Sequence, residues 1–493
     1  MARPPLTDPP RVHMTSNMEE SDYHADATAG RQAEEDASRR TTAFHAMDVA
    51  GRSNHDEHDD AEVELGRRHK PLTPFERVGN AILPSGGALS SALTLASSTL
   101  GASTIALPGA FSVCGMGLAS IFLILCAVAT VFSINLLAKA HVRTGLGSYE
   151  VLARTLLGRP AEWLCGAVMV VFCFGTAVAY IIAVGELAKP LLPAQALLPA
   201  AFRGRWGLRL ITFLYWSITM FPMSLKREIN ALRYFTLIGV AAIVYFIIVI
   251  VAHAAQSQGA LRAKRLADLD FARFDNNMVV GLSLILFAFC CQPNVYEVYS
   301  ELHEPRTPRR MTTIGAASMT CCTILYLVAG FFGYADFGRT VHGAVLEDYN
   351  PYTSAAIFIS YICLGVKLTV AFSLNINPTR DTFLYALNLG SYHTAPDKYR
   401  WLVSGTLSVA ALLLALFIPS LEVVFGFLGG LCGSTLGFIL PALFVMYAGD
   451  WSRSTVSLGE YVGTWALLLV GIAAMIFGTA GSIYQAVVEG TGL

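Results

Sequence analysis

Charged residues are scarce in this chain. They make up 14% of its 493 residues, whereas soluble globular proteins carry roughly 25%. Hydrophobic residues reach 54% and recur in apolar runs of about 20 residues, the length that crosses a bilayer. The composition therefore excludes an ordinary soluble domain and indicates an all-α polytopic membrane protein.

Motifs of several other protein classes are also missing. No G-x-x-x-x-G-K-[ST] loop is present, which argues against an ATP-driven pump. The loop histidines have neither a neighbouring nucleophile nor metal spacing, so we expect no enzyme, no cofactor, no metal site and no nucleic acid partner. The ten cysteines lie in or beside apolar runs without a pairing pattern. We therefore expect free thiols that pack as small residues rather than disulfides.

Aromatic side chains are rare in residues 1–84. This segment is rich in Asp, Glu, His, Arg and Ser and cannot bury enough apolar surface to offset the entropy of ordering. We expect a disordered cytosolic tail without a secretory signal. Its stretch from Asn54 to Glu64 could bind a metal through His55 and His58, but a solvated acidic tail is the simpler interpretation.

The rest of the chain contains eleven candidate spans. Positive charge in the short loops favours a cytosolic N-terminus and, with an odd count, an extracellular C-terminus. The spans lie near 88–111, 116–138, 161–188, 206–224, 230–253, 277–300, 310–334, 353–377, 400–419, 422–447 and 462–486.

Two of these spans carry residues that interrupt a helix, and they occupy matching positions in two halves. The first reads ALTLASSTLGASTIALPGAF, from Ala92 to Phe111, and the second reads LSLILFAFCCQPNVYEVYSEL, from Leu282 to Leu302. Unpaired backbone groups in lipid cost several kcal/mol, so such breaks persist only where they line a cavity or pack against protein. Paired breaks are typical of the substrate site of an inverted-repeat transporter. Close packing by small residues is the alternative for each break taken alone.

The breaks also suggest a domain organisation. A repeat of five spans reverses its orientation in the membrane, so two successive five-span units are antiparallel. We expect a first repeat at 85–255, an outer loop at 256–276 and a second repeat at 277–448. Residues 449–493 would add an eleventh helix and a short extracellular C-terminus.

Six segments in order resemble the amino acid/auxin permease family, and most closely its kinetoplastid amino acid permeases. They are LASSTLGASTIALP, SYEVLARTLLG, FPMSLKREINALRYFTLIGV, CQPNVYEVYSEL, NPTRD and FGFLGGLCGSTLGFILPALF. The resemblance implies an eleven-helix LeuT/APC-type fold with a 5+5 inverted repeat, broken first and sixth helices, and secondary transport of neutral or cationic amino acids. Gln292 stands where the family often has His, so a proton role of that His is not available here.

The expected substrate site lies at the two breaks. The N–H groups after Gly101 suit a carboxylate, because a helix N-terminus attracts anions, and carbonyls released near Pro293 suit an ammonium. Tyr180 is either a wall of the site or a packed aromatic residue. The expected substrate-binding residues are Ser98, Thr99, Gly101, Ala102, Ser103, Thr104, Tyr180, Phe289, Cys291, Gln292 and Asn294.

Lys367 is the outstanding charge within the spans, where charged residues are costly and often functional. By the resemblance, sodium-coupled members place an Asn at the position of Ser97 and a Thr near Thr369. Our hypothesis is that the Lys367 ammonium takes the place of sodium. It would either exchange a proton, since desolvation disfavours a buried charge, or stay charged in a uniporter. A structural lysine paired with an acid or with carbonyl dipoles is the alternative.

Two acidic residues belong to the same question. Glu186, near the end of its span, is expected to be a solvated end residue. Glu297, where the family run often has Pro, could pair with Lys367, with a basic residue of an inner loop or with the side chain of a cationic substrate. Together, Ser97, Lys367, Thr369 and Glu297 form the expected ion-coupling set.

The function expected from these features is sodium-independent amino acid transport in the plasma membrane, by proton coupling or uniport. Arginine or lysine would suit an acidic residue such as Glu297. The alternatives are an amino acid sensor on a transporter fold and a sodium-coupled neutral amino acid symporter. The expected partners are therefore an amino acid, a proton in the coupled case, and lipid, and the sequence gives no oligomeric state.

Overall fold

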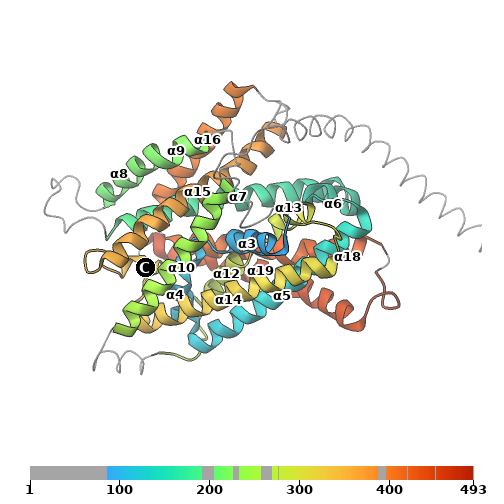
Figure 1. The fold of residues 1–493 in the computed structure, drawn as a ribbon, viewed down its shortest axis with the longest axis horizontal. Helices are drawn as coiled ribbons and strands as arrows, with labels where there is room; N and C mark the ends of the chain where they lie inside the picture. Colours follow the sequence, from blue (N-terminus) through green and yellow to red (C-terminus); the bar gives the residue numbers. More distant parts are fainter. Residues whose placement is uncertain are drawn as a thin grey trace, which may run out of the picture. The chain divides into compact units, whose positions relative to one another are not determined.

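The computed structural model describes residues 86–190, 205–225, 232–256, 269–275, 277–386, 396–418, 420–449 and 451–491. All of them belong to one compact unit, Gly79–Leu493. The expected disordered tail, with its acidic stretch around His55 and His58, lies outside the described residues, as does most of the expected outer loop at 256–276. Within the described part the chain forms helices and no strands (Figure 1).

The first half of the described chain runs from α3 to α10. Its helices are α3 (Ala88–Thr99), α4 (Ser103–Cys114), α5 (Met116–Thr144), α6 (Tyr149–Leu157), α7 (Arg159–Ala188), α8 (Arg205–Tyr215), α9 (Phe221–Ser224) and α10 (Leu232–Gln256). A π-helical turn, Trp216–Met220, joins α8 to α9.

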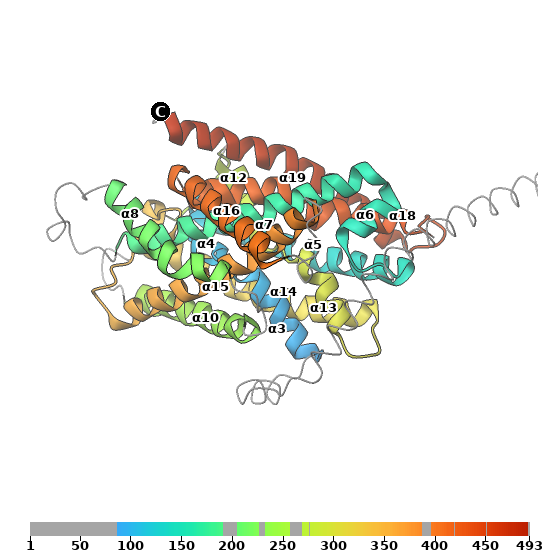
Figure 2. The ribbon, with the colours of Figure 1, turned by 90° about the horizontal axis from the view of Figure 1, so that it is seen from above.

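The second half runs from α12 to α19. Its helices are α12 (Asn277–Ala288), α13 (Val295–Glu301), α14 (Pro308–Phe337), α15 (Ala355–Ala386), α16 (Asp397–Phe417), α17 (Leu421–Leu428), α18 (Leu440–Tyr447) and α19 (Leu458–Thr491). The π-helical turns Gly429–Gly433 and Thr435–Ile439 continue α17 into α18. The helix α19 runs along one edge of the bundle (Figure 2).

Nine helical segments of the described part are long and apolar enough to cross a membrane. They are α5, α7, α10, α12–α13, α14, α15, α16, α17–α18 and α19. The protein is therefore a multi-pass membrane protein. The first expected span is divided into α3 and α4, of 12 residues each, and the fourth consists of α8, a π turn and α9.

Small residues set the closest helix contacts in the run from Phe425 to Pro441. A Cβ on Gly429 would lie 1.8 Å from the carbonyl oxygen of Ser283, and one on Gly430 would lie 2.6 Å from the backbone of Gly478. The π-helical segment therefore packs backbone against backbone on α12 and α19. Such contacts allow helices to approach closely where lipid supplies no hydrophobic drive.

We expect Gly429→Ala to destabilise the protein, because the added methyl has no space beside Ser283. Overpacking of this kind costs about 1–3 kcal/mol or more. The melting temperature of the purified protein in detergent should fall, whereas Gly459→Ala should leave it unchanged, since a Cβ at Gly459 meets nothing within 4 Å. Equal melting temperatures for both variants would contradict the contact.

The cysteines are as expected. All ten thiols are free, and eight of them are buried. Cys321 is exposed and Cys363 is half-buried. The fold is therefore held together by packing and hydrogen bonds, with no disulfide.

Candidate functional site

Both expected helix breaks are present, and they adjoin. The helix α3 ends at Thr99 and α4 begins at Ser103. The helix α12 ends at Ala288, and a short 3-10 turn at Gln292–Asn294 leads into α13. The buried hydroxyl of Tyr326 on α14 lies 2.7 Å from the Thr99 carbonyl oxygen and 3.0 Å from that of Ala288. One side chain thus reaches the last carbonyl of both interrupted helices.

The carbonyls released at the end of α3 are taken up by side chains of two other helices. The last four carbonyls of a helix have no partner within it. That of Ala96 receives the Leu100 N–H and lies 3.9 Å from the Cys322 thiol, and that of Thr99 accepts from Tyr326. The carbonyl of Ser97 lies 3.5 Å from Lys367 Nζ. Side chains of α14 and α15 therefore contact the carbonyls that the break in the first span releases.

The start of α4 has the properties of an anion site. Its N-cap is Ala102, whose side chain cannot accept a hydrogen bond. The N–H groups of Thr104 and Ile105 donate to the carbonyls of Gly101 and Ala102 at 3.2 and 3.1 Å, so the start of α4 offers a ligand the Ser103 N–H group and the positive end of the helix dipole. A Cβ on Gly101 would lie 3.3 Å from the Tyr180 hydroxyl oxygen. The half-buried Tyr180 thus lies against the break. The Thr104 hydroxyl is buried without a hydrogen-bond partner among the described residues.

Lys367 lies between three helices and is 9% exposed. Its Nζ lies 3.5 Å from both the carbonyl and the hydroxyl oxygen of Ser97 on α3. Gly239 of α10 makes room for it, since a Cβ there would lie 2.4 Å from Lys367 Cδ and 3.1 Å from Nζ. Within the described part of the chain, no acidic side chain pairs with Lys367. The contact with Ser97 is the one that the hypothesis of a lysine in a cation position requires.

Thr369 does not join this cluster. Its hydroxyl lies 2.9 Å from that of Tyr215 on α8 and donates to the Gly365 carbonyl. Residues two apart on a helix do not share a face, so Thr369 points toward α8 while Lys367 points toward α3. The structure therefore places the Thr369 hydroxyl apart from the contact between Lys367 and Ser97.

Glu297 does not pair with Lys367 in the structure, and Glu186 differs from expectation. Glu297 lies on an exposed face of α13, whereas Lys367 is enclosed by other helices, so the two do not pair. Glu186 is buried rather than solvated. Its Oε1 accepts a hydrogen bond of 3.3 Å from the Leu421 N–H, and a carboxylate is favourable at the beginning of a helix such as α17.

Of the other expected substrate residues, two contact Tyr326 and the rest lie elsewhere in or beside the breaks. Ser103 is buried with its hydroxyl 3.3 Å from that of Tyr326, and the Phe289 ring packs edge-to-face on the same tyrosine. Ser98 is exposed and bonds only within its own helix. Gln292 is buried beside Gly437, and a Cβ added to Gly437 would lie 3.3 Å from Nε2 of Gln292. Cys291 is fully buried, and Asn294 is half-buried.

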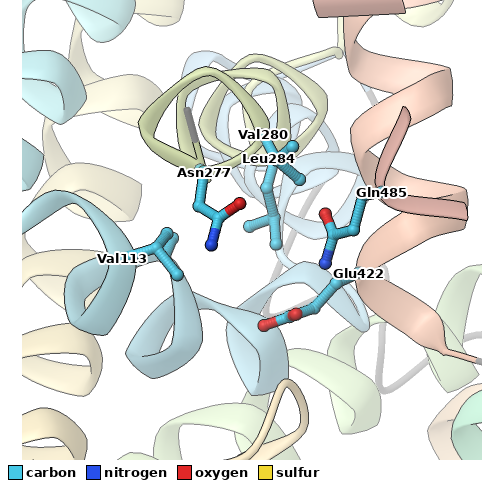
Figure 3. Close-up of a pocket in the computed structure, with 8 residues that line it drawn as sticks. Val113, Asn277, Val280, Leu284, Glu422 and Gln485 are labelled. Atoms are coloured by element: carbon cyan, nitrogen blue, oxygen red, sulfur yellow. The ribbon is translucent and has the colours of Figure 1, made fainter. Parts of the chain in front are cut away.

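A small cavity lies between the C-terminal end of α4 and the N-terminal end of α12. Its volume is about 30 Å³, which holds a water or two and no amino acid. Asn277 of α12, Glu422 of α17 and Gln485 of α19 point into it beside apolar residues of α4 and α12 (Figure 3). The sequence analysis did not identify this trio, because its members come from three separate helix ends.

Ion pairs link the helix ends and the segment between α14 and α15. Lys189 lies 2.5 Å from Glu347, and His253 at the end of α10 lies 2.6 Å from Asp336. His342 lies 2.5 Å from Asp348, and this hydrogen bond raises the pKa of His342. Since the raised pKa favours the charged imidazolium, this contact stabilises the segment at low pH and weakens as the pH rises through that pKa. The first two contacts thereby tie the end of α7 to the segment after α14, and the end of α10 to α14 itself.

Comparison with known proteins gives consistent results. A family model described as "Transmembrane amino acid transporter protein" matches residues 84–484. The amino acid transporter AVT6E of Arabidopsis thaliana is 27% identical over 415 residues, which cover 81% of this chain and 83% of that protein. Vacuolar amino acid transporter 5 of Schizosaccharomyces pombe is 26% identical over 360 residues, covering 72% and 83%. Solute carrier family 38 member 10 of Mus musculus is 27% identical over 368 residues, covering 70% and 32%.

Proposed function

Because this chain belongs to the transmembrane amino acid transporter protein family, we propose that it carries amino acids across a membrane by alternating access around its two helix breaks. The observation that carries this proposal is the meeting of both breaks at Tyr326, beside the uncapped start of α4. The relatives are named as transporters, which confirms that the chain is no enzyme and confirms the family resemblance of its motifs.

The backbone at the breaks supplies groups for both ends of an amino acid. The substrate carboxylate binds the Ser103 N–H group at the start of α4, next to Gly101 and Tyr180. The substrate ammonium binds the carbonyls of Thr99 and Ala288, which end two helices and carry the negative ends of their dipoles. In this proposal Ser103, Thr104 and Phe289 surround these groups, and Ser98 is exposed near the end of α3.

The architecture that suits this mechanism has eleven spans. The pair α3–α4 acts as the first span and the pair α8–α9 as the fourth, which adds two to the nine long segments of the described part. The spans α3–α10 and α12–α18 then form two five-span repeats, and α19 is an addition. Two antiparallel repeats place a broken helix in each half at the same depth.

Lys367 is the proposed coupling group. Its contact with Ser97 supports sodium-independent transport in which the ammonium replaces a bound cation, with proton coupling or uniport as the two modes. The exposed Glu297 no longer favours a cationic substrate over a neutral one. Both substrate classes remain within the proposal.

The location proposed from the sequence is the plasma membrane with a cytosolic N-terminus. A relative named as a vacuolar transporter makes an internal acidic compartment the competing location. Fractionation of cells that express the tagged full chain decides between them. Protease protection of an N-terminal tag in sealed vesicles tests the orientation.

Uptake of a panel of labelled amino acids into proteoliposomes tests the function. Each amino acid is assayed with sodium, without sodium and with the proton gradient collapsed. Saturable uptake without sodium is the expected result, and its response to the proton gradient separates symport from uniport. Strict sodium dependence would refute the role of Lys367, and no uptake by well-folded protein would favour a sensor.

A further inference from the structure

The hydroxyl of Tyr326 occupies the junction between the two breaks. Tyr326 is fully buried, and its oxygen lies 2.7 Å from the Thr99 carbonyl, 3.0 Å from the Ala288 carbonyl and 3.3 Å from the Ser103 hydroxyl. The Phe289 ring holds it from the side, with 5.4 Å between the ring centroids. All three polar neighbours belong to the breaks, and none belongs to the helix that carries the tyrosine.

The hydrogen-bonding capacity of this group does not match its surroundings. A phenol has one proton, and each of the two carbonyls needs a donor. Tyr326 can therefore satisfy one of them fully at any moment. An ammonium group offers three N–H donors and a positive charge, which suits two carbonyls at the negative ends of helix dipoles.

We propose that the Tyr326 hydroxyl stands in for the substrate ammonium when the transporter is empty. It holds the ends of α3 and α12 together, so that the carrier can change its orientation without cargo. When a substrate arrives, its ammonium takes both carbonyls, and the hydroxyl turns to the Ser103 hydroxyl. This inference rests on the proposed function and adds to it a residue that controls the return of the empty carrier.

The proposal separates two transport modes. Net uptake into vesicles that contain no substrate requires the empty carrier to return in every cycle. Exchange of labelled for unlabelled substrate uses the loaded carrier only. In Tyr326→Phe the empty carrier loses the donor that joins its two breaks, whereas the loaded carrier keeps the substrate ammonium. Net uptake should therefore fall while exchange persists.

The test uses purified full-length protein in liposomes and one amino acid that the wild type transports. For Tyr326→Phe we expect net uptake to fall about tenfold, the loss that follows from one unsatisfied buried group, with exchange within about twofold of the wild type and a KM for exchange that is unchanged or lower. The matched control is Tyr334→Phe, also buried on α14, whose hydroxyl accepts from the Asp270 N–H away from the breaks. It should leave the ratio of net uptake to exchange unchanged.

Several outcomes would overturn the proposal. Equal losses of net uptake and exchange would show a structural role, and no loss of either would show no role. If Tyr326→Phe does not fold, Ser103→Ala provides the second test, because it removes the alternative partner of the hydroxyl in the loaded carrier. It should raise the KM for exchange and preserve the ratio of the two modes, and an unchanged KM would count against the proposal. A wild type that transports no amino acid would instead refute the proposed function itself.

Discussion

Uptake by the Lys367→Met variant is expected to fall about tenfold and to lose any dependence on pH. A charged residue at membrane depth is costly and usually functional, so removing the charge of Lys367 should impair transport. Methionine has a similar length and no proton to exchange. Lys367 Nζ lies 3.5 Å from both oxygens of Ser97, and the variant would remove the ammonium from this contact at the end of α3. The loss should therefore appear in transport before it appears in folding.

The two coupling modes give different patterns for this variant. With proton coupling, wild-type uptake follows the proton gradient and the variant's residual uptake does not. With a permanent charge in a uniporter, neither protein responds to the gradient, and only the rate falls. Lys139→Met is the control, since Lys139 pairs with Glu460 at 2.6 Å, remote in the fold from Ser97. An unchanged rate and pH profile in Lys367→Met would refute a coupling role.

The Gly101→Ala variant is expected to bind substrate about tenfold more weakly, because small misplacements in a transport or catalytic site carry large costs. Its new Cβ would lie 3.3 Å from the Tyr180 hydroxyl oxygen, closer than an ordinary contact. The phenol would have to shift away from the start of α4. The KM for uptake measures this effect, with the amount of folded protein measured in parallel.

A double variant shows whether this contact is the cause. Tyr180→Phe removes the oxygen that meets the new methyl and also removes a proposed substrate contact. Gly101→Ala should therefore raise the KM less in the Tyr180→Phe background than in the wild type. If the two effects simply add, the loss in Gly101→Ala comes from elsewhere, and the two residues do not act at one site.

The breaks could be predicted from the sequence because their chemistry is local. Glycine, serine and threonine at 97–104 and proline at 293 are poorly suited to a plain spanning helix, and both helices end within a few residues of them. The contact of Lys367 with Ser97 was expected from the family resemblance, by which Ser97 stands where sodium-coupled members place an Asn. These features need only a residue type and an order of helices.

The sequence does not show which face of a helix points toward a neighbour, or which helix ends that are distant in the sequence pack together. Thr369 differs from Lys367 by two positions, and the sequence does not say which of the two faces α3. Glu186 is buried because α17 begins beside it, which requires the packing of two distant helices. Tyr326 looks like any aromatic residue in an apolar span, and only the structure shows that its hydroxyl meets both breaks.

The burial of the thiols provides a way to follow the opening of the transporter by cysteine labelling. Cys291 and Cys322 lie fully buried at the two breaks, and Cys322 contacts the Ala96 carbonyl. A water-soluble thiol reagent can reach such groups only when a passage opens to one side of the membrane. The native chain thus carries its own reporters of opening, once the exposed Cys321 and the half-buried Cys363 have been replaced before labelling.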